Sequence, residues 1–444
     1  MSAEGAAGPA VMVRSRTFVP VYLTHALVHL FVGLFPAVLF ALRDATGADY
    51  ATLGAVFTAA MTVYGFGALP TGALVNRVAP VTVIRASLAG GVLACLLIAV
   101  APSALWFAVA LVLLGAACGP YHTAGLTVVS RAGGNDPRLL GHHGVVGNIG
   151  LAAAPTFGAV LAWAVSWRLS FACAAALGAV LLVWLVWRLP TTLGTERPVT
   201  VTEPPALPFP DAGGASPADA AQMSSARDGT HVPALALVLS ITVALGFIYR
   251  GFATFLPALA AQRVGLLPAG ELVRGGLIAS AVYLVGMLGQ LWGGHLGRRR
   301  RPEVVYAALL ALTAVLLLLC FAARGWLLVV LLSSFSLVHF TTQPMDNTFT
   351  GKYTSWRRRG LGYGLSFGLS FGIGSFAAWA GGGVVDAAGG QIRYVCLLLA
   401  GVAAVAALLA VALAIVARST WRRDAGGAPE ASRPRPARDL PSTG

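Results

Sequence analysis

The feature that most constrains the fold of this chain is a series of long apolar runs separated by short polar segments. A run of about 20 apolar residues is needed to cross ~30 Å of hydrocarbon as an α-helix. The 444 residues contain twelve such runs, at 18–42, 51–75, 82–101, 104–130, 141–164, 168–188, 233–261, 273–296, 303–322, 326–350, 362–384 and 393–416. Since only 10% of the residues are charged and 57% are hydrophobic, a soluble domain is excluded. The sequence predicts an all-α membrane protein with twelve transmembrane helices.

The distribution of basic residues predicts the orientation of the chain. A formal net charge of +14 would be compatible with nucleic-acid binding. With both termini in the cytoplasm, however, 23 of the 30 Lys and Arg residues lie on the cytoplasmic side, the bias usual in membrane proteins. We therefore expect a multi-pass protein of the plasma membrane, which in a bacterium is the inner membrane. We expect the protein to contact the lipid bilayer and not to bind nucleic acid.

A proline-rich segment predicts how the chain is divided. Residues 189–231 contain seven prolines and show no helical or strand periodicity, which is typical of a disordered linker. We expect a cytoplasmic N-terminal segment at 1–17, a six-helix half at 18–188, a cytoplasmic linker at 189–231, a second six-helix half at 232–417 and a disordered cytoplasmic tail at 418–444.

The two halves show traces of an internal repeat. A shift of 221 residues places Pro36 on Pro257, Gly65 on Gly286 and Gly147 on Gly368. The matches recur in three pairs of spans and fall on residues that shape the backbone. The sequence therefore predicts two halves in parallel orientation.

Two overlapping Gly-x-Ser-x-Gly sequences, centred on Ser366 and Ser370, raise the question of a hydrolase. The nucleophile of such an enzyme sits on a sharp turn between a strand and a helix. Here the serines lie in a predicted membrane helix, and Gly364, Gly368 and Gly372 recur every fourth residue, a spacing that favours close packing of helices. We interpret the motif as a packing face and expect no enzyme. Because the five cysteines lie in five different spans without metal-ligand spacing, we also expect no metal site and no cofactor.

Twelve spans in two halves with a long central loop resemble the major facilitator superfamily. The loop between spans 2 and 3 in that family reads Gly-x-x-x-Asp-Arg-x-Gly-Arg-Arg. This chain keeps Gly72 and Arg77 but has Asn76 at the aspartate position, and the loop between spans 8 and 9 keeps Gly293 and Arg298. The resemblance implies a loop that links helices during a conformational cycle. The missing aspartate argues against the charge relay through which this loop usually links the helices.

Span 5 resembles the glycine-proline motif of antiporters in the family. Gly147, Gly150, Pro155 and Gly158 match, and Ala154 replaces a glycine. The match favours export, whereas Leu111 occupies the position of an arginine that drug-proton antiporters often carry in span 4. The span 1 histidines and the sequence PYHTAG in span 4 are similar to the fosmidomycin-resistance branch.

Charged and titratable groups inside hydrocarbon are costly and usually mark a transport pathway. Away from span ends they are His25, His29, His122, Arg250, His339 and Asp346. All of them lie in spans 1, 4, 7 and 10, which in the family line the central cavity. Helix spacing predicts two layers, with His25, His122 and Asp346 nearer the cytoplasm and His29, Arg250 and His339 deeper. A hydrogen-bonded packing role is the alternative for His25 and for His339, each taken by itself. His142, His143 and His295 are expected at the membrane interface.

The hypothesis from the sequence is a proton-linked secondary transporter that exports a small organic molecule of anionic character. Arg250 is expected to bind the substrate, with Tyr249 on another helix face, and Asp346 to carry the proton. Three alternatives stay open: a permanent ion pair between Arg250 and Asp346, a symporter or facilitator that imports an organic acid or sugar-like solute, and a non-transporting sensor or scaffold. We expect the protein to be a monomer whose partners are its small-molecule substrate and protons.

The predicted topology can be tested by labelling. We expect Ser216→Cys and Ser432→Cys, each introduced after removal of the native cysteines, to resist a membrane-impermeant thiol reagent in intact cells, because both positions are predicted to be cytoplasmic. Labelling from outside at either position would contradict the orientation or the number of spans.

Overall fold

A computed structural model describes residues 9–133, 137–195, 230–265, 270–297, 299, 301–355 and 358–426. All regular secondary structure in these ranges is helical. The helices of the first half are α1 (Pro9–Ala37), α2 (Leu39–Thr46), α3 (Tyr50–Leu74), α4 (Pro80–Ala99), α5 (Ala104–Ala132), α6 (Pro137–Ala164) and α7 (Trp167–Arg188). Those of the second half are α9 (Val232–Arg263), α10 (Glu271–Leu296), α11 (Pro302–Ala322), α12 (Gly325–Tyr353), α13 (Arg359–Phe371), the 3₁₀ turn η2 (Ile373–Ser375), α14 (Phe376–Ala387) and α15 (Tyr394–Gly426).

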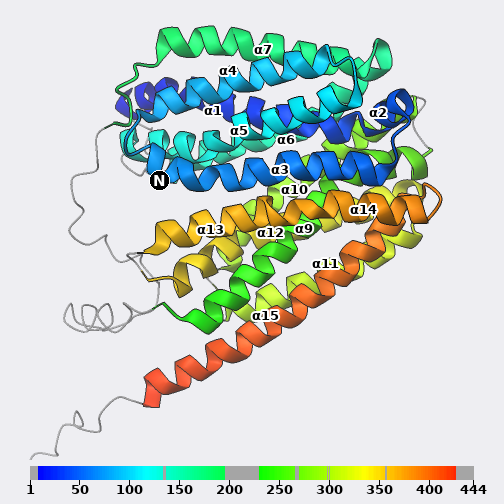
Figure 1. Cartoon of the computed structure of the whole chain (residues 1–444). Helices are drawn as coiled ribbons and strands as arrows, with labels where there is room; N and C mark the ends of the chain where they lie inside the picture. The colour runs from blue at the N-terminus through cyan, green and yellow to red at the C-terminus, as the bar shows by residue number, and fades with distance from the viewer. Residues whose placement is uncertain are drawn as a thin grey trace, which may run out of the picture.

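The two halves form two bundles, one above the other in Figure 1. Within the described residues, twelve helical spans are long and apolar enough to cross a membrane, as the sequence predicts. The start of α1, the end of α7, the start of α9 and the end of α15 lie at the same end of the molecule, on the left in Figure 1. Each half therefore passes from one end of the molecule to the other an even number of times.

Two of the predicted spans are interrupted. The first run was expected to continue to residue 42, but α1 ends at Ala37 and a second helix begins at Leu39. Pro36 has no backbone N–H to donate and its ring disfavours a continuous helix, which accounts for a break at this point. The eleventh run, expected to be continuous over 362–384, changes to a 3₁₀ turn at Ile373–Ser375.

The first and last helices extend beyond the predicted ends of the halves, although their apolar spans, Thr17–Ala37 and Tyr394–Arg418, begin and end close to those boundaries. Residues 9–17 belong to α1, although 1–17 was expected to be a separate segment, and α15 continues nine residues beyond 417. Most of the predicted linker (196–229) and most of the predicted tail (427–444) lie outside the described residues.

The halves meet mainly where α3 packs against α13 and α14 and where α6 packs against α10, with a smaller contact between α1 and α9. Glycines permit these contacts. An added Cβ at Gly65 would lie 2.4 Å from the backbone N of Gly372, and one at Gly276 would lie 2.6 Å from the carbonyl oxygen of Pro155. Gly364, Gly368 and Gly372 face Leu69 and Phe66 of α3. The recurring glycines of the Gly-x-Ser-x-Gly stretch thus lie at the junction of the halves.

Hydrogen bonds cross the same junction. The carboxylate of Asp386 accepts bonds from the backbone N–H groups of Tyr50 (3.1 Å) and Ala51 (2.7 Å) at the start of α3. A carboxylate is favourable at this position because a helix N-terminus carries partial positive charge and free N–H groups. Between α6 and α10, the hydroxyls of Thr156 and Ser280 lie 2.7 Å apart, and the Asn148 amide donates to Gln290 over 2.8 Å. Both junctions are therefore closed by polar contacts as well as by packing.

Helix α6 also packs tightly on α1 through the glycine-proline motif. An added Cβ at Gly150 would lie 2.0 Å from the carbonyl oxygen of Ala26, and one at Gly158 would lie 2.7 Å from the Cβ of Ala37. An added Cβ at Gly147 would lie 2.4 Å from the ring of His25. The motif thus brings the α6 backbone against α1 and leaves room for an imidazole between them.

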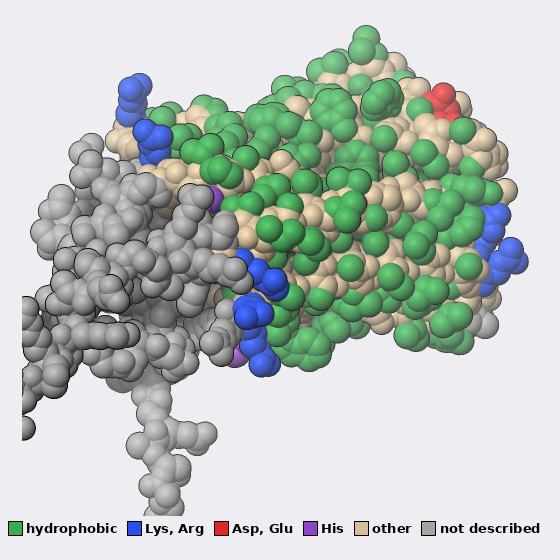
Figure 2. Space-filling model, turned by 90° about the horizontal axis from the view of Figure 1, so that it is seen from below, with side chains coloured by type: hydrophobic (Ala, Val, Ile, Leu, Met, Phe, Trp, Pro, Cys, Tyr) green, Lys and Arg blue, Asp and Glu red, His purple; other side chains and the backbone are tan. Residues whose placement is uncertain are grey.

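Apolar side chains cover the middle of the outer surface. Exposed apolar residues near the middle of their helices include Val180, Leu284, Leu312 and Leu408. Figure 2 shows this apolar belt, with Lys and Arg side chains near the two ends. The pattern matches a chain whose outer surface faces lipid and whose charges lie in the headgroup regions.

The α1–α6 contact gives a test of the packing. We expect Gly150→Ala to lower the unfolding temperature in detergent, because a methyl group there collides with backbone, and overpacking costs about 1–3 kcal/mol. Gly144→Ala on the same helix is the control, since an added Cβ there meets nothing within 4 Å. Equal stability of the two variants would contradict the close contact.

Candidate functional site

Three histidines predicted to lie on the pathway form one cluster. His25 and His29 are one helical turn apart on α1, and His122 reaches them from α5. One side-chain nitrogen from each lies within 4.8 Å of the others. The ring centre of His25 lies 4.7 Å from that of His29 and 5.1 Å from that of His122. His29 thus contacts two histidines of the layer predicted nearer the cytoplasm, because one helical turn is short enough for the imidazoles to meet.

His143 extends this cluster, although the sequence placed it at the membrane interface. It is 5% exposed, and its ring stacks on His25 with the centres 4.1 Å apart. Its backbone carbonyl accepts a hydrogen bond of 2.8 Å from Nδ1 of His25. The interface prediction is wrong for His143 because α6 packs so closely on α1 that this position is covered. His142 and His295 are exposed.

Two tyrosines that the sequence analysis did not select support the histidines. The Tyr64 hydroxyl on α3 forms a hydrogen bond with Nε2 of His122. The Tyr121 hydroxyl donates to the carbonyl of Val21 and lies 3.2 Å from Nε2 of His143. The position of Tyr121 beside His122 in the chain offered a weak signal, whereas nothing in the sequence connects Tyr64 to span 4.

Arg250 on α9 is a buried cation surrounded by aromatic rings. It is 6% exposed, and its guanidinium carbon lies 4.6 Å from the ring centre of Phe371 and 5.7 Å from that of Tyr64. The ring of Tyr249 is 5.5 Å away, so the expectation that Tyr249 points elsewhere is wrong. No ion pair with Arg250 occurs among the described residues, and its Nε is buried without a hydrogen-bond partner there.

Asp346 on α12 is held at a different site. Its two carboxylate oxygens accept hydrogen bonds from the hydroxyls of Thr242 (2.8 Å) and Tyr306 (2.9 Å), and all three residues are buried. Thr242 precedes Arg250 by eight residues on α9, which corresponds to about 12 Å along the helix. The structure therefore gives Asp346 and Arg250 separate neighbours and does not pair them.

His339 belongs to an aromatic stack. Its ring lies parallel to those of Phe335 and Tyr249, with centre distances of 5.6 and 6.1 Å. It is 1% exposed, and its Nδ1 has no partner within the described part of the chain. His339 is therefore packed among aromatic rings, without the hydrogen bond that the packing alternative expected at Nδ1.

A small central cavity lies between the halves. Its volume is ≈ 30 Å³, which is enough for about one or two water molecules. Its walls come from α1, α3, α6, α9, α10 and α13 and include His29, Pro36, Tyr64, Pro155, Tyr249, Arg250, Tyr283 and Phe371. Two predicted pathway residues, His29 and Arg250, thus share one cavity that receives residues from both halves.

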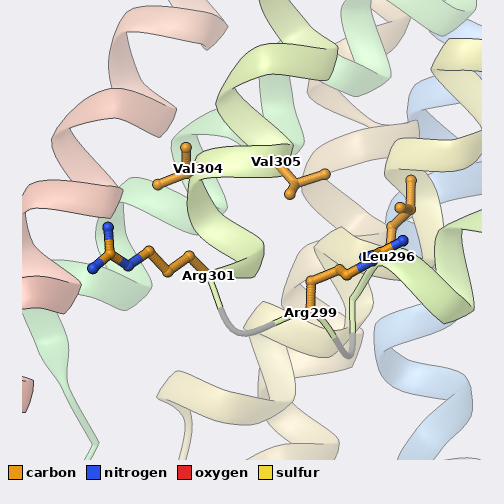
Figure 3. A pocket seen from close by; sticks show the side chains of 5 residues that line it. All are labelled: Leu296, Arg299, Arg301, Val304 and Val305. Carbon is orange, nitrogen blue, oxygen red and sulfur yellow. The ribbon is translucent and has the colours of Figure 1, made fainter.

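The loop motifs lie away from this cavity. Asn76, which stands at the family's aspartate position, accepts a hydrogen bond of 2.8 Å from Arg131 at the end of α5. Gly72 has free space at its Cβ position, whereas Gly293 packs against the carbonyl of Thr341, and Arg77 is exposed. Arg298 lies outside the described residues. Figure 3 shows the neighbouring surface pocket of ≈ 520 Å³, where Arg299 and Arg301 point in different directions beside Val304 and Val305.

The fold and this arrangement of residues can now be compared with known proteins. The family model of the Major Facilitator Superfamily matches residues 21–378. The chain belongs to the major facilitator superfamily. No curated protein matches it closely enough to be counted as a relative.

Solved structures of transporters share the fold. A bacterial homologue of the human lysosomal transporter Spinster, inward-facing and unoccupied, superposes with a TM-score of 0.71 at 14% identity, over 94% of this chain and 99% of that one. The peptide transporter POT in complex with sulfate gives 0.70 at 15% identity, over 90% and 94%. The nucleoside transporter NupG gives 0.66 at 16% identity, over 89% and 98%.

The fold also answers the question raised by the Gly-x-Ser-x-Gly sequences. Ser366 and Ser370 lie within α13, and Ser366 is 6% exposed. A continuous helix does not provide the strained strand-to-helix turn that exposes a hydrolase nucleophile. The family and fold of this superfamily member are those of membrane transporters.

Proposed function

We propose that this superfamily member is a secondary active transporter, coupled to protons, that moves a small organic anion by alternating access. The observation that carries the proposal is Arg250, a buried guanidinium on the wall of the central cavity with no carboxylate partner among the described residues. A guanidinium stays protonated at cellular pH and its planar fork suits carboxylate or phosphonate oxygens. The substrate anion supplies the compensating charge.

The aromatic rings around Arg250 are compatible with this role. Tyr64, Tyr249 and Phe371 lie within 5.7 Å of the guanidinium carbon and also line the cavity. Aromatic faces attract a cation and partly offset its cost when no anion is bound. The N–H groups are then free to bind an anion that arrives in the cavity. The buried charge of Arg250 is thus stabilised by the anion when one is bound and by the aromatic rings when none is.

The position of the cavity supports alternating access. Tyr64 comes from the first half, Arg250 from the second, and Phe371 from α13 at the junction itself. In transporters built from two repeats, the halves rock around a site near the midplane. A volume of ≈ 30 Å³ is too small for an organic solute, so this conformation corresponds to a closed step that must open to admit one.

Asp346 is the proposed proton carrier. Its carboxylate is buried, accepts only two neutral hydroxyl bonds, and has no cationic partner in the described structure. Such a group can exist protonated or ionised, and its position in a bundle that moves allows the two forms to face different sides. The glycine-proline motif of α6, which resembles that of antiporters, favours export. We also propose that both termini lie in the cytoplasm and that the protein acts as a monomer in the plasma membrane.

Transport in proteoliposomes with an imposed pH gradient tests the function and its alternatives. A proton-coupled exporter moves substrate against its gradient in the direction opposite to the protons, whereas a symporter moves both together. A facilitator only equilibrates the solute, and a sensor or scaffold moves none. A thermal-shift screen of carboxylates, phosphonates, cations and neutral solutes identifies the solute to use, because a ligand of the folded state raises the unfolding temperature.

The role of Arg250 gives the first functional prediction. We expect small organic anions to stabilise the parent protein, Arg250→Lys to weaken their binding by loss of the planar fork, and Arg250→Gln to remove it. Fluorescence-detected size exclusion checks that each variant still folds. The ion-pair alternative predicts instead that Arg250→Gln is unstable and that adding Asp346→Asn restores its stability. Restoration in that double variant would overturn the anion role.

The role of Asp346 gives the second. We expect Asp346→Asn to abolish accumulation driven by a pH gradient, because the amide cannot take up and release a proton. Exchange of labelled for unlabelled substrate needs no net proton movement and should continue. Thr348→Val on the same helix is the control, since Thr348 is exposed and its hydroxyl bonds only its own helix. Gradient-driven accumulation at the parent level in Asp346→Asn would contradict this assignment.

A further inference from the structure

The proposed transport cycle uses Arg250 and Asp346 but does not explain why three imidazoles meet in the first half. His25, His29 and His122 each bring one nitrogen within 4.8 Å of the other two. We propose that these three histidines bind a divalent transition-metal ion such as Zn²⁺, Co²⁺ or Ni²⁺. The site lies between α1 and α5, beside the central cavity that His29 helps to line.

The spacing is suitable for an ion after a small adjustment. Zinc binds histidine nitrogen at about 2.0–2.1 Å in a tetrahedron, which places two such nitrogens about 3.4 Å apart. The present upper limit of 4.8 Å means that the rings must close by roughly 1.4 Å at most to reach that geometry. The proposal requires this movement to come from the side-chain torsions of the three histidines.

The hydrogen bonds prepare the rings as metal ligands. The His143 carbonyl can only accept, so Nδ1 of His25 carries the proton and Nε2 keeps its lone pair. Nε2 of His29 is buried and has no hydrogen-bond partner in the described structure. When Nε2 of His122 donates to Tyr64, its Nδ1 presents the lone pair. Partners of this kind orient the histidines of known metal sites and fix their tautomers.

The ligand set selects the class of ion. Neutral imidazoles suit Zn²⁺, Co²⁺, Ni²⁺ and Cu²⁺, whereas Mg²⁺ and Ca²⁺ require oxygen ligands. Three histidines leave a fourth position open in a tetrahedral site. The ion's two charges are not offset by these ligands, and Arg250 adds a third positive charge on the wall of the same cavity. An anion such as chloride from the solution is therefore the fitting fourth ligand.

Direct binding of metal tests the site. Full-length protein is purified through an affinity tag that contains no histidine, treated with EDTA, and titrated with Zn²⁺ and with Co²⁺ in chloride buffer. We expect one equivalent per chain by calorimetry and elemental analysis, visible absorption typical of tetrahedral Co²⁺, and no response to Mg²⁺. Failure to bind either transition metal would overturn the proposal.

Variants locate the ion. His29→Gln and His122→Gln each remove a ligand and should weaken Zn²⁺ binding by about 100-fold or more, beyond the 10–100-fold usual for loss of a supporting residue. His142→Gln and His295→Gln are the matched controls, since both remove an exposed histidine, and they should bind as the parent does. Unchanged affinity in the first pair, or loss of the equivalent in a control, would show binding elsewhere.

One further variant tests the geometry without removing a histidine. In Gly147→Ala the new methyl group falls 2.4 Å from the His25 ring, so the imidazole must move and Zn²⁺ binding should weaken by about tenfold or more. Gly144→Ala on the same helix, where nothing lies within 4 Å, should leave it unchanged. The unfolding temperature without metal shows whether each variant is folded. A folded Gly147→Ala protein with parent affinity would contradict the placement of His25 in the site.

Discussion

Close contact between helix backbones is the interaction on which this structure depends. In lipid, apolar side chains gain little by leaving one apolar surface for another, so helices associate mainly through packing and hydrogen bonds. Glycine allows that contact to become very short, as at Gly150 against α1 and Gly65 against the α13–α14 junction. The same contacts set the distances between polar side chains. His143 of α6 stacks on His25 because α6 approaches α1 closely at Gly147.

The buried polar groups fall into two kinds with different surroundings. In the first half, imidazoles and tyrosine hydroxyls contact one another, and none of these imidazoles forms an ion pair in the described structure. In the second half, Arg250 lies among aromatic rings and Asp346 among hydroxyls. Asp346 contacts Thr242, which lies about 12 Å along α9 from Arg250, and no ion pair joins the cation and the acid in the described structure. This arrangement is the basis of the proposal that a solute and a proton are handled by different residues of one bundle.

The central cavity lies between the two halves, whose relative movement is part of the proposed function. It is lined by His29 from one half and Arg250 from the other, and it is bounded by α13 just before the helix breaks at Ile373–Ser375. A broken helix at a junction can change its direction with little loss of backbone hydrogen bonding. The interruption therefore lies at the contact between the halves, which the proposed alternating access would have to open and close.

The sequence by itself determined the twelve helices, their order and the candidate charged residues, because hydrocarbon allows few polar groups and requires every backbone bond to be made within a helix. It also singled out His25, His29, His122, Arg250 and Asp346 from their rarity in apolar runs. Only the tertiary structure decided which of them meet. His29 joins His25 and His122, His143 is buried, Tyr64 supports His122, and Tyr249 shares the environment of Arg250. The physical reason is that contacts between helices depend on how closely and at what rotation their backbones pack, and these are set by many small residues acting together rather than by the period of any single span.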